Sequence, residues 1–159
     1  MPFTIRKAAP ADAAAACAVL RRSIQECCGE DHQGRPAVLE AWLRNKTPEI
    51  VRPWFSSSAG YAVVAEAGGA IVGTALMGGD RSIVLCYLVP EARYQGVGKA
   101  MLAALEAEAR ARGFAALELQ STKSGHAFYR RNGYVDTGVP VSVFGLPAQP
   151  MRKDLAPIR

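Results

Sequence analysis

The chain has 159 residues, of which 50% are hydrophobic and 21% are charged, and its formal net charge is +5. That length and balance predict one globular domain spanning residues 1–159. No apolar run reaches the roughly 18 residues of a membrane span, and the first residues lack the apolar core of a signal peptide, so we expect a cytoplasmic protein without a membrane partner. Lys and Arg are scattered along the chain, which argues against a nucleic-acid partner.

The first third of the chain is predicted to be mainly helical. A short strand opens it, and Pro10 begins a helix at a position where the missing N–H costs nothing. The polar residues 29–35 are predicted to form a turn, and Pro36 begins the next helix. The elements expected here are a strand at 3–7, a helix from 10 to about 23 or 27, a helix from 36, and a short helix or turn at 48–55.

Strands dominate the rest of the chain. Gly68-Gly69 joins two β-like runs and is a strong hairpin signal, and glycines at 113 and 133 are typical of helix C-termini. The expected elements are strands at 61–66, 70–77, 83–89, 115–120, 134–137 and 151–155, and helices at 98–112 and 123–132. This order predicts an α/β protein with a mixed sheet of six to seven strands, flanked by about four helices.

The cysteine spacing predicts neither a disulfide framework nor a metal site. Cys27 and Cys28 are adjacent, and no C-x-x-C pair occurs. Cys27 and Cys28 with Asp31 and His32 match no common zinc spacing. We therefore expect reduced thiols and no bound metal.

The most informative feature is a pair of glycines, Gly96 and Gly98, between a strand and a helix. The first N–H groups of a helix lack intrahelical partners, and glycine lets an anion approach them closely. A dinucleotide fingerprint would need a third glycine where Met101 stands. A P-loop would need glycine at Arg93 and Ser or Thr at Ala100. The pattern thus predicts a phosphate site of another kind.

Three segments together resemble the GNAT family of N-acetyltransferases. Arg93-x-x-Gly96-x-Gly98, preceded by Leu88-Val89-Pro90, is similar to the coenzyme A loop of that family. The run Ala127-Phe128-Tyr129-Arg130-Arg131-Asn132-Gly133-Tyr134 is similar to its second motif, and Met151–Leu155 to its last strand. The resemblance spans residues 60–155 and implies a GNAT-like fold with acetyl-coenzyme A as cosubstrate.

The resemblance also assigns the residues that bind this cosubstrate. Backbone N–H groups of the loop would hold the pyrophosphate, side chains of Arg93 and Lys99 would add charge, and the strand before the loop would pair with the pantetheine arm. An N–H at or near Leu88 would face the thioester oxygen and stabilise an oxyanion. The implied binding residues are Cys86, Leu88, Val89, Arg93, Gln95, Gly96, Val97, Gly98, Lys99 and Thr122. Thr122 stands where many members of the family have Asn, and it can cap the following helix.

By the same resemblance, Tyr129 is the catalytic residue that points at the coenzyme sulfur. A phenol with a pKa of ~10 is protonated at working pH and can donate a proton to the departing thiolate. Glu30, Asp31 and His32 border the expected acceptor site. The sequence identifies no general base, and Cys86, on a buried strand, is not expected to act as a nucleophile.

Acetyl transfer to an amine by direct attack in a ternary complex is therefore the leading hypothesis. The alternative is a catalytically silent module that senses or carries acyl-coenzyme A. The acceptor can be a small amine, an antibiotic, an amino acid or a peptide N-terminus, and the protein a monomer or a homodimer. The uncharged apolar segment 138–150 is either a covered β-loop, a wall of the acceptor pocket or a dimer surface.

Overall fold

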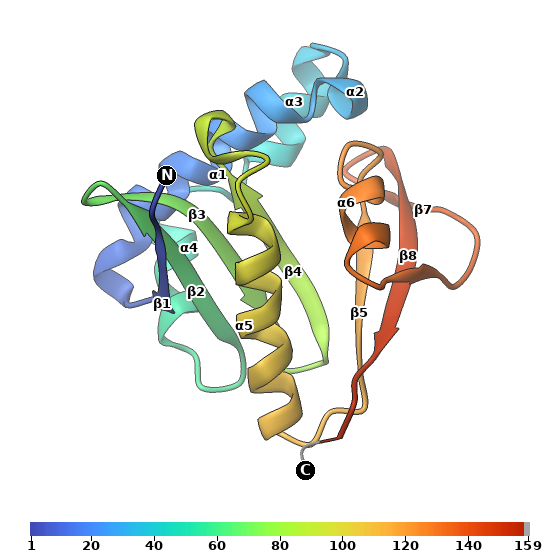
Figure 1. The fold of residues 1–159 in the computed structure, drawn as a ribbon. Coiled ribbons are helices and arrows are strands. Elements are labelled where there is room, and N and C mark those ends of the chain that lie inside the picture. Colours follow the sequence, from blue (N-terminus) through green and yellow to red (C-terminus); the bar gives the residue numbers. More distant parts are fainter. Residues whose placement is uncertain (158–159) are drawn as a thin grey trace.

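Eight strands form a mixed sheet in a computed structural model that describes residues 1–157 (Figure 1). The strand order is β1-β2-β3-β4-β5-β8-β6, and β7 pairs with β8 off this path. The strands are β1 (Thr4–Lys7), β2 (Tyr61–Ala67), β3 (Ala70–Met77), β4 (Ser82–Leu88), β5 (Ala116–Ser121), β6 (Val135–Asp136), β7 (Val141–Val143) and β8 (Leu146–Asp154).

Helices cover both faces of the sheet. Val97, Met101 and Leu105 of α5 pack on one face, whereas Leu20 of α1 and Val51 of α4 pack on the other. The helices are α1 (Ala13–Cys27), α2 (Gly29–His32), α3 (Pro36–Leu43), α4 (Pro48–Ser56), α5 (Val97–Ala111) and α6 (His126–Arg131), with 3₁₀ turns η1 (Pro10–Asp12) and η2 (Pro90–Ala92). The sheet is thus the middle of three layers.

The parallel contact between β4 and β5 is very short. Only Ser82 pairs with Glu118 and Ile83 with Leu119, and beyond these pairs the two strands diverge. Figure 1 shows the resulting V between an N-terminal half that holds β1–β4 and a C-terminal half that holds β5–β8. The edge of β4 that faces β5 therefore lacks a strand partner from position 84 onward.

A buried polar contact joins α5 to the C-terminal half. The Tyr134 hydroxyl donates to Glu106 of α5 at 3.0 Å, and the Lys153 ammonium of β8 donates to the same carboxylate at 2.9 Å. The Tyr134 ring lies edge-on to the ring of Tyr129, with 5.9 Å between the ring centroids. This contact fixes the face of α6 against α5 and thereby the opening of the V.

The sheet and its mixed character agree with the sequence prediction, but three details were wrong. Within residues 1–157 there are eight strands, because segment 138–150 forms a hairpin of β7 with a β8 that begins at Leu146, and there are six α-helices rather than about four. Residues 29–35 contain the one-turn helix α2 rather than only a turn, and α6 begins at His126. Short helices and irregular strands lack the periodic pattern that would reveal them.

Candidate active site

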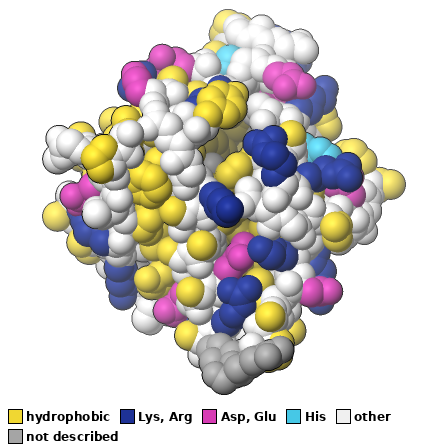
Figure 2. Space-filling model, in the orientation of Figure 1, with side chains coloured by type: hydrophobic (Ala, Val, Ile, Leu, Met, Phe, Trp, Pro, Cys, Tyr) yellow, Lys and Arg dark blue, Asp and Glu magenta, His cyan; other side chains and the backbone are white. Residues whose placement is uncertain are grey.

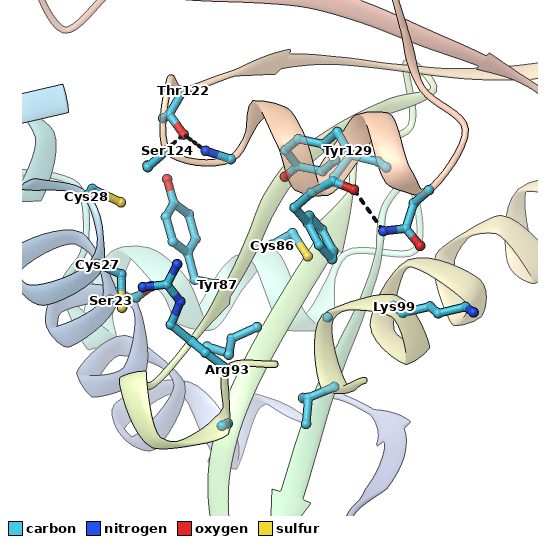
Figure 3. Close-up of a pocket in the computed structure, with 18 of the residues that line it drawn as sticks. Ser23, Cys27, Cys28, Cys86, Tyr87, Arg93, Lys99, Thr122, Ser124 and Tyr129 are labelled. Carbon is cyan, nitrogen blue, oxygen red and sulfur yellow. Dashed lines mark hydrogen bonds between the residues drawn. The ribbon is translucent and has the colours of Figure 1, made fainter. Parts of the chain in front are cut away.

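A cavity of about 460 Å³ occupies the opening between β4 and β5. Its walls come from the C-terminal end of α1, the edge of β4, the loop before α5, the start of α5, and α6 with the turn before it. Figure 3 shows Tyr87 and Tyr129 directed into this space from opposite sides, with Cys86 between them. We call this space the donor cavity.

The free edge of β4 presents backbone groups to the donor cavity. Tyr87 pairs with Thr74 of β3, and the Val89 N–H donates to Val72 at 2.9 Å. Because successive N–H groups of a strand point to opposite edges, those of Cys86 and Leu88 face the cavity. An extended ligand can therefore hydrogen-bond to this edge as a further strand would.

The loop before α5 leaves backbone N–H groups free at a helix N-terminus. Gly96 caps α5 with a φ of 84°, a conformation that favours glycine, and a Cβ there would meet no atom within 4 Å. The hydrogen bonds of α5 begin at Ala100, whose N–H donates to the Gly96 carbonyl at 3.0 Å. The N–H groups before it have no intrahelical acceptor and carry the positive end of the helix dipole.

Gly98 serves packing rather than a left-handed backbone. A Cβ at this position would lie 2.9 Å from the Phe128 ring, which closes the cavity between α5 and α6. The two glycines of the motif are thus required for different physical reasons. Sequence reasoning gave both the same reason, a close approach of phosphate to the backbone.

The loop also holds a residue in a strained conformation. Tyr94 has a φ of 63°, although its side chain is 87% exposed and makes no core contact. The guanidinium of Arg93 lies 5.0 Å from the centroid of the Tyr94 ring. Glycine would adopt this left-handed backbone without strain.

Positive charge gathers around the donor cavity. Arg93, Lys99 and Arg131 line it, and Figure 2 shows Lys and Arg side chains along the same face of the molecule. In Figure 3 the Arg93 side chain runs toward α1, whereas Lys99 points away from the other labelled side chains. Arg93 is therefore better placed than Lys99 to reach into the cavity.

Tyr129 lies on α6 between two other aromatic rings. The Phe128 ring is 5.2 Å and the Tyr134 ring 5.9 Å from it, both edge-on. Burial raises the pKa of the Tyr129 phenol well above its ordinary value of 10. The phenol therefore stays protonated at neutral pH and can act as a proton donor in the cavity.

Thr122 and Asp31 organise the turn that leads into α6. The Thr122 hydroxyl accepts a hydrogen bond from the Gly125 N–H at 3.1 Å, so Thr122 stabilises this turn, whereas the N-cap of α6 itself is Gly125, without a side-chain cap. The Asp31 carboxylate, on α2, accepts hydrogen bonds from the Lys123 N–H at 2.6 Å and the Ser124 hydroxyl at 2.6 Å. Asp31 thus connects the two sides of the V at its open end.

The three residues predicted to border the acceptor site lie in different surroundings. Asp31 and His32 are buried, and Glu30 is exposed. The two ring nitrogens of His32 are engaged within the protein: Nδ1 accepts from the Gly34 N–H at 2.9 Å and Nε2 donates to the Ile24 carbonyl at 3.0 Å. Asp31 and His32 therefore have structural contacts that the prediction of a polar turn did not anticipate.

A second cavity of about 570 Å³ adjoins the first. We call it the acceptor-side cavity. Its walls include Trp42 of α3, Trp54 of α4 and Phe144 of the β7–β8 hairpin. The hairpin segment 138–150 therefore contributes a wall of this cavity.

Tyr87 contributes to both cavities, and sequence reasoning missed it. It lines the donor cavity and the acceptor-side cavity, and burial raises the pKa of its phenol. A tyrosine within the apolar strand that precedes the glycine loop was the available signal. Its position makes it a second candidate for contact with reacting groups.

Two of the thiols lining the donor cavity, those of Cys28 and Cys86, are poor nucleophiles. Burial raises the pKa of Cys86 to about 12 and that of Cys28 to about 12, so both remain protonated at neutral pH. Among residues 1–157, no three His, Cys, Asp or Glu side chains lie close enough together to hold a metal ion. No helix of this part of the chain is long and apolar enough to cross a bilayer.

Comparisons with known proteins agree with this geometry. A family model described as an acetyltransferase (GNAT) domain matches residues 27–155. A comparison with curated proteins finds no match. Among solved structures, a GCN5-related N-acetyltransferase from Rhodopseudomonas palustris is 27% identical, with a TM-score of 0.84 over 98% of this chain and 97% of that one.

Two further solved structures share the fold and contain a coenzyme A ligand. The PaiA N-acetyltransferase from Thermoplasma acidophilum, in complex with coenzyme A, is 20% identical, with a TM-score of 0.82 over 97% of this chain and 99% of that one. YncA from Salmonella typhimurium, a putative acetyltransferase with acetyl-CoA, is 21% identical, with a TM-score of 0.72 over 100% and 97%.

Proposed function

The chain belongs to the GNAT acetyltransferase family, and from this premise we propose that it transfers the acetyl group of acetyl-CoA to an amine by direct attack in a ternary complex. The observation that carries the proposal is the donor cavity. It combines an unpaired strand edge, a helix N-terminus with free N–H groups, and a protonated tyrosine. This combination suits a ligand with an amide-bearing arm, a pyrophosphate and a thioester.

The residues of the donor cavity fit such a ligand in three places. The N–H groups at Gly96–Lys99 would bind the pyrophosphate, with added charge from Arg93. The backbone groups of Cys86 and Leu88 would pair with the pantetheine arm. Two structural neighbours of under 25% identity bind coenzyme A or acetyl-CoA, which supports the same assignment here.

The chemistry asks the protein to orient two reactants and to hold charge and protons. Acetyl-CoA supplies the acetyl group as an activated thioester. The neutral nitrogen of the acceptor amine forms a bond to the carbonyl carbon, and the carbon–sulfur bond breaks. The departing sulfur gains one proton and the amine nitrogen loses one, so the number of protons is unchanged. The products are an N-acetyl amide and free coenzyme A thiol.

Two groups of this chain would assist these steps. The N–H of Leu88 would donate a hydrogen bond to the thioester oxygen as negative charge develops there. Tyr129 would donate its phenolic proton to the departing sulfur. Because burial raises the pKa of Tyr129, its proton remains available across the neutral range. The acceptor would enter from the acceptor-side cavity, which meets the donor cavity at Tyr87.

Two measurements test the proposal. Calorimetry with acetyl-CoA should show binding, and a thiol-release assay with a panel of amines should show acceptor-dependent turnover. The Tyr129→Phe variant should lose turnover by about 10²-fold, the scale of general-acid catalysis, with a donor Kd within about twofold of wild type. Equal turnover would remove Tyr129 from the chemistry. Binding without thiol release under any acceptor would favour the acyl-coenzyme A sensor, and no binding would refute the site.

A further inference from the structure

A buried lysine lies in the wall of the acceptor-side cavity. Lys46 belongs to the short connection between α3 and α4, and only 4% of its surface is exposed. It lines the cavity together with its neighbour Asn45 and with Phe144 from the tip of the β7–β8 hairpin. Lysine is almost never buried to this degree without a partner of opposite charge.

The backbone of Lys46 is held in place by α1 and by the end of α3. Its carbonyl accepts hydrogen bonds from the Cys17 thiol at 2.9 Å and from the Arg21 guanidinium at 3.0 Å. Its N–H donates to the Leu43 carbonyl at 2.9 Å. These contacts set where the side chain starts, so its direction toward the cavity is built into the helical scaffold.

The ammonium group of Lys46 has neutral neighbours. It donates to the Asn45 side-chain oxygen at 2.7 Å and lies 5.1 Å from the centroid of the Phe144 ring. Among residues 1–157, no carboxylate oxygen lies within 4.0 Å of it. The amide accepts one of its three N–H donors, which leaves capacity for an anionic partner.

Burial without a negative charge is energetically costly for an ammonium. In agreement, burial lowers the pKa of Lys46 to about 8 from an ordinary value of 10.5. The Arg21 guanidinium, which donates to the Lys46 carbonyl, is itself positive. Asp31, Asp80 and Glu118 line the same cavity, but none of them forms an ion pair with Lys46. A ligand carboxylate in the cavity would supply the missing counter-charge.

We propose that Lys46 binds a carboxylate of the acceptor, so that the acetylated amine belongs to an amino acid or a similarly compact amino-carboxylate. This inference rests on the proposed function, because it assumes that the acceptor occupies the acceptor-side cavity. The aromatic walls formed by Trp42, Trp54 and Phe144 suit an apolar side chain between the two charged ends.

The experiment compares each of the twenty L-amino acids with its own carboxamide as acceptor, in a thiol-release assay near pH 7.5. The carboxamide retains the amine and the side chain but has no charge for Lys46 to bind. For the preferred amino acids, wild type should show a kcat/KM at least about 30-fold higher than for the matched amide, the scale expected for a desolvated charge pair.

The Lys46→Met variant keeps the length of the side chain and removes its charge. It should abolish the preference by lowering kcat/KM for the carboxylate form while leaving the amide within about threefold of wild type. Lys7→Met is the matched control, because Lys7 is exposed on β1 and lines neither cavity. The control should keep the full preference for the carboxylate.

A binding measurement separates this inference from the proposed function. With coenzyme A present, calorimetry should show that wild type binds the N-acetyl derivative of a preferred amino acid more tightly than its amide, and that Lys46→Met does not. If no amino acid outperforms its amide, or if Lys46→Met keeps the preference, the role of Lys46 is refuted. Loss of acetyl-CoA binding or of all thiol release would instead refute the proposed function.

Discussion

Replacing Asp31 by asparagine removes one acceptor from a carboxylate that joins the two sides of the V. Asp31 is 6% exposed on α2. It accepts hydrogen bonds from Lys123 and Ser124, which lie 92 and 93 positions further along the chain. The donors are the Lys123 N–H at 2.6 Å, the Ser124 N–H at 3.3 Å and the Ser124 hydroxyl at 2.6 Å. The asparagine NH₂ group cannot accept from any of them.

The size of the effect follows from these contacts. A hydrogen bond to a charged group contributes about 1.5–3 kcal/mol, and leaving a buried donor unpaired adds to the loss. Asparagine keeps one oxygen, so we expect the free energy of unfolding to fall by about 2–4 kcal/mol. For a domain of this length, that corresponds to a Tm lower by about 5–15 °C.

Urea denaturation and thermal melting measure this change, with Glu30→Gln as the control. Glu30 is the exposed neighbour of Asp31, and its substitution should change stability by less than about 0.5 kcal/mol. Because the turn held by Asp31 leads into α6, Asp31→Asn should also lower kcat by about tenfold at temperatures where the variant is folded. Stability equal to that of the control would refute the connection across the V.

Three further predictions follow from the backbone and from burial. Gly96→Val should weaken acetyl-CoA binding at least about tenfold in calorimetry, because a β-branched residue does not tolerate a φ of 84°; an unchanged Kd would contradict the loop assignment. Tyr94→Gly should raise the free energy of unfolding in urea by about 1 kcal/mol by relieving a left-handed backbone at φ 63°, and a less stable variant would show that no strain is stored there. Since burial lowers the pKa of Lys46 to about 8, the folded state binds fewer protons than the unfolded state between about pH 8 and 10.5, so this residue makes stability increase with pH. Urea titrations at pH 7.5 and pH 10 measure how the free energy of unfolding changes with pH. On going from pH 7.5 to pH 10 it should rise less, or fall more, in Lys46→Met than in wild type; identical changes in the two proteins would argue against a buried ammonium.

The order of the elements was predictable from local sequence alone. Apolar runs bounded by glycine and proline marked the major strands, and Pro10, Pro36 and Gly113 marked helix ends, because the conformations of these residues are restricted or permitted by local sterics. The Gly96 and Gly98 motif likewise pointed to an anion site at a helix start. These signals need only neighbouring residues, so no tertiary information was required.

The surroundings of three residues near the cavities, Asp31, Lys46 and Tyr87, were decided by the tertiary structure. Sequence reasoning placed Asp31 beside the expected acceptor site without identifying its partners, and it assigned no role to Lys46 or Tyr87. Each acquires its role from partners or cavities that residues distant in sequence create: Lys123 and Ser124 for Asp31, Phe144 for Lys46, and the diverging strands for Tyr87. Local sequence encodes backbone conformation through short-range sterics, whereas burial, desolvation and charge pairing depend on which distant segments the folded chain brings together.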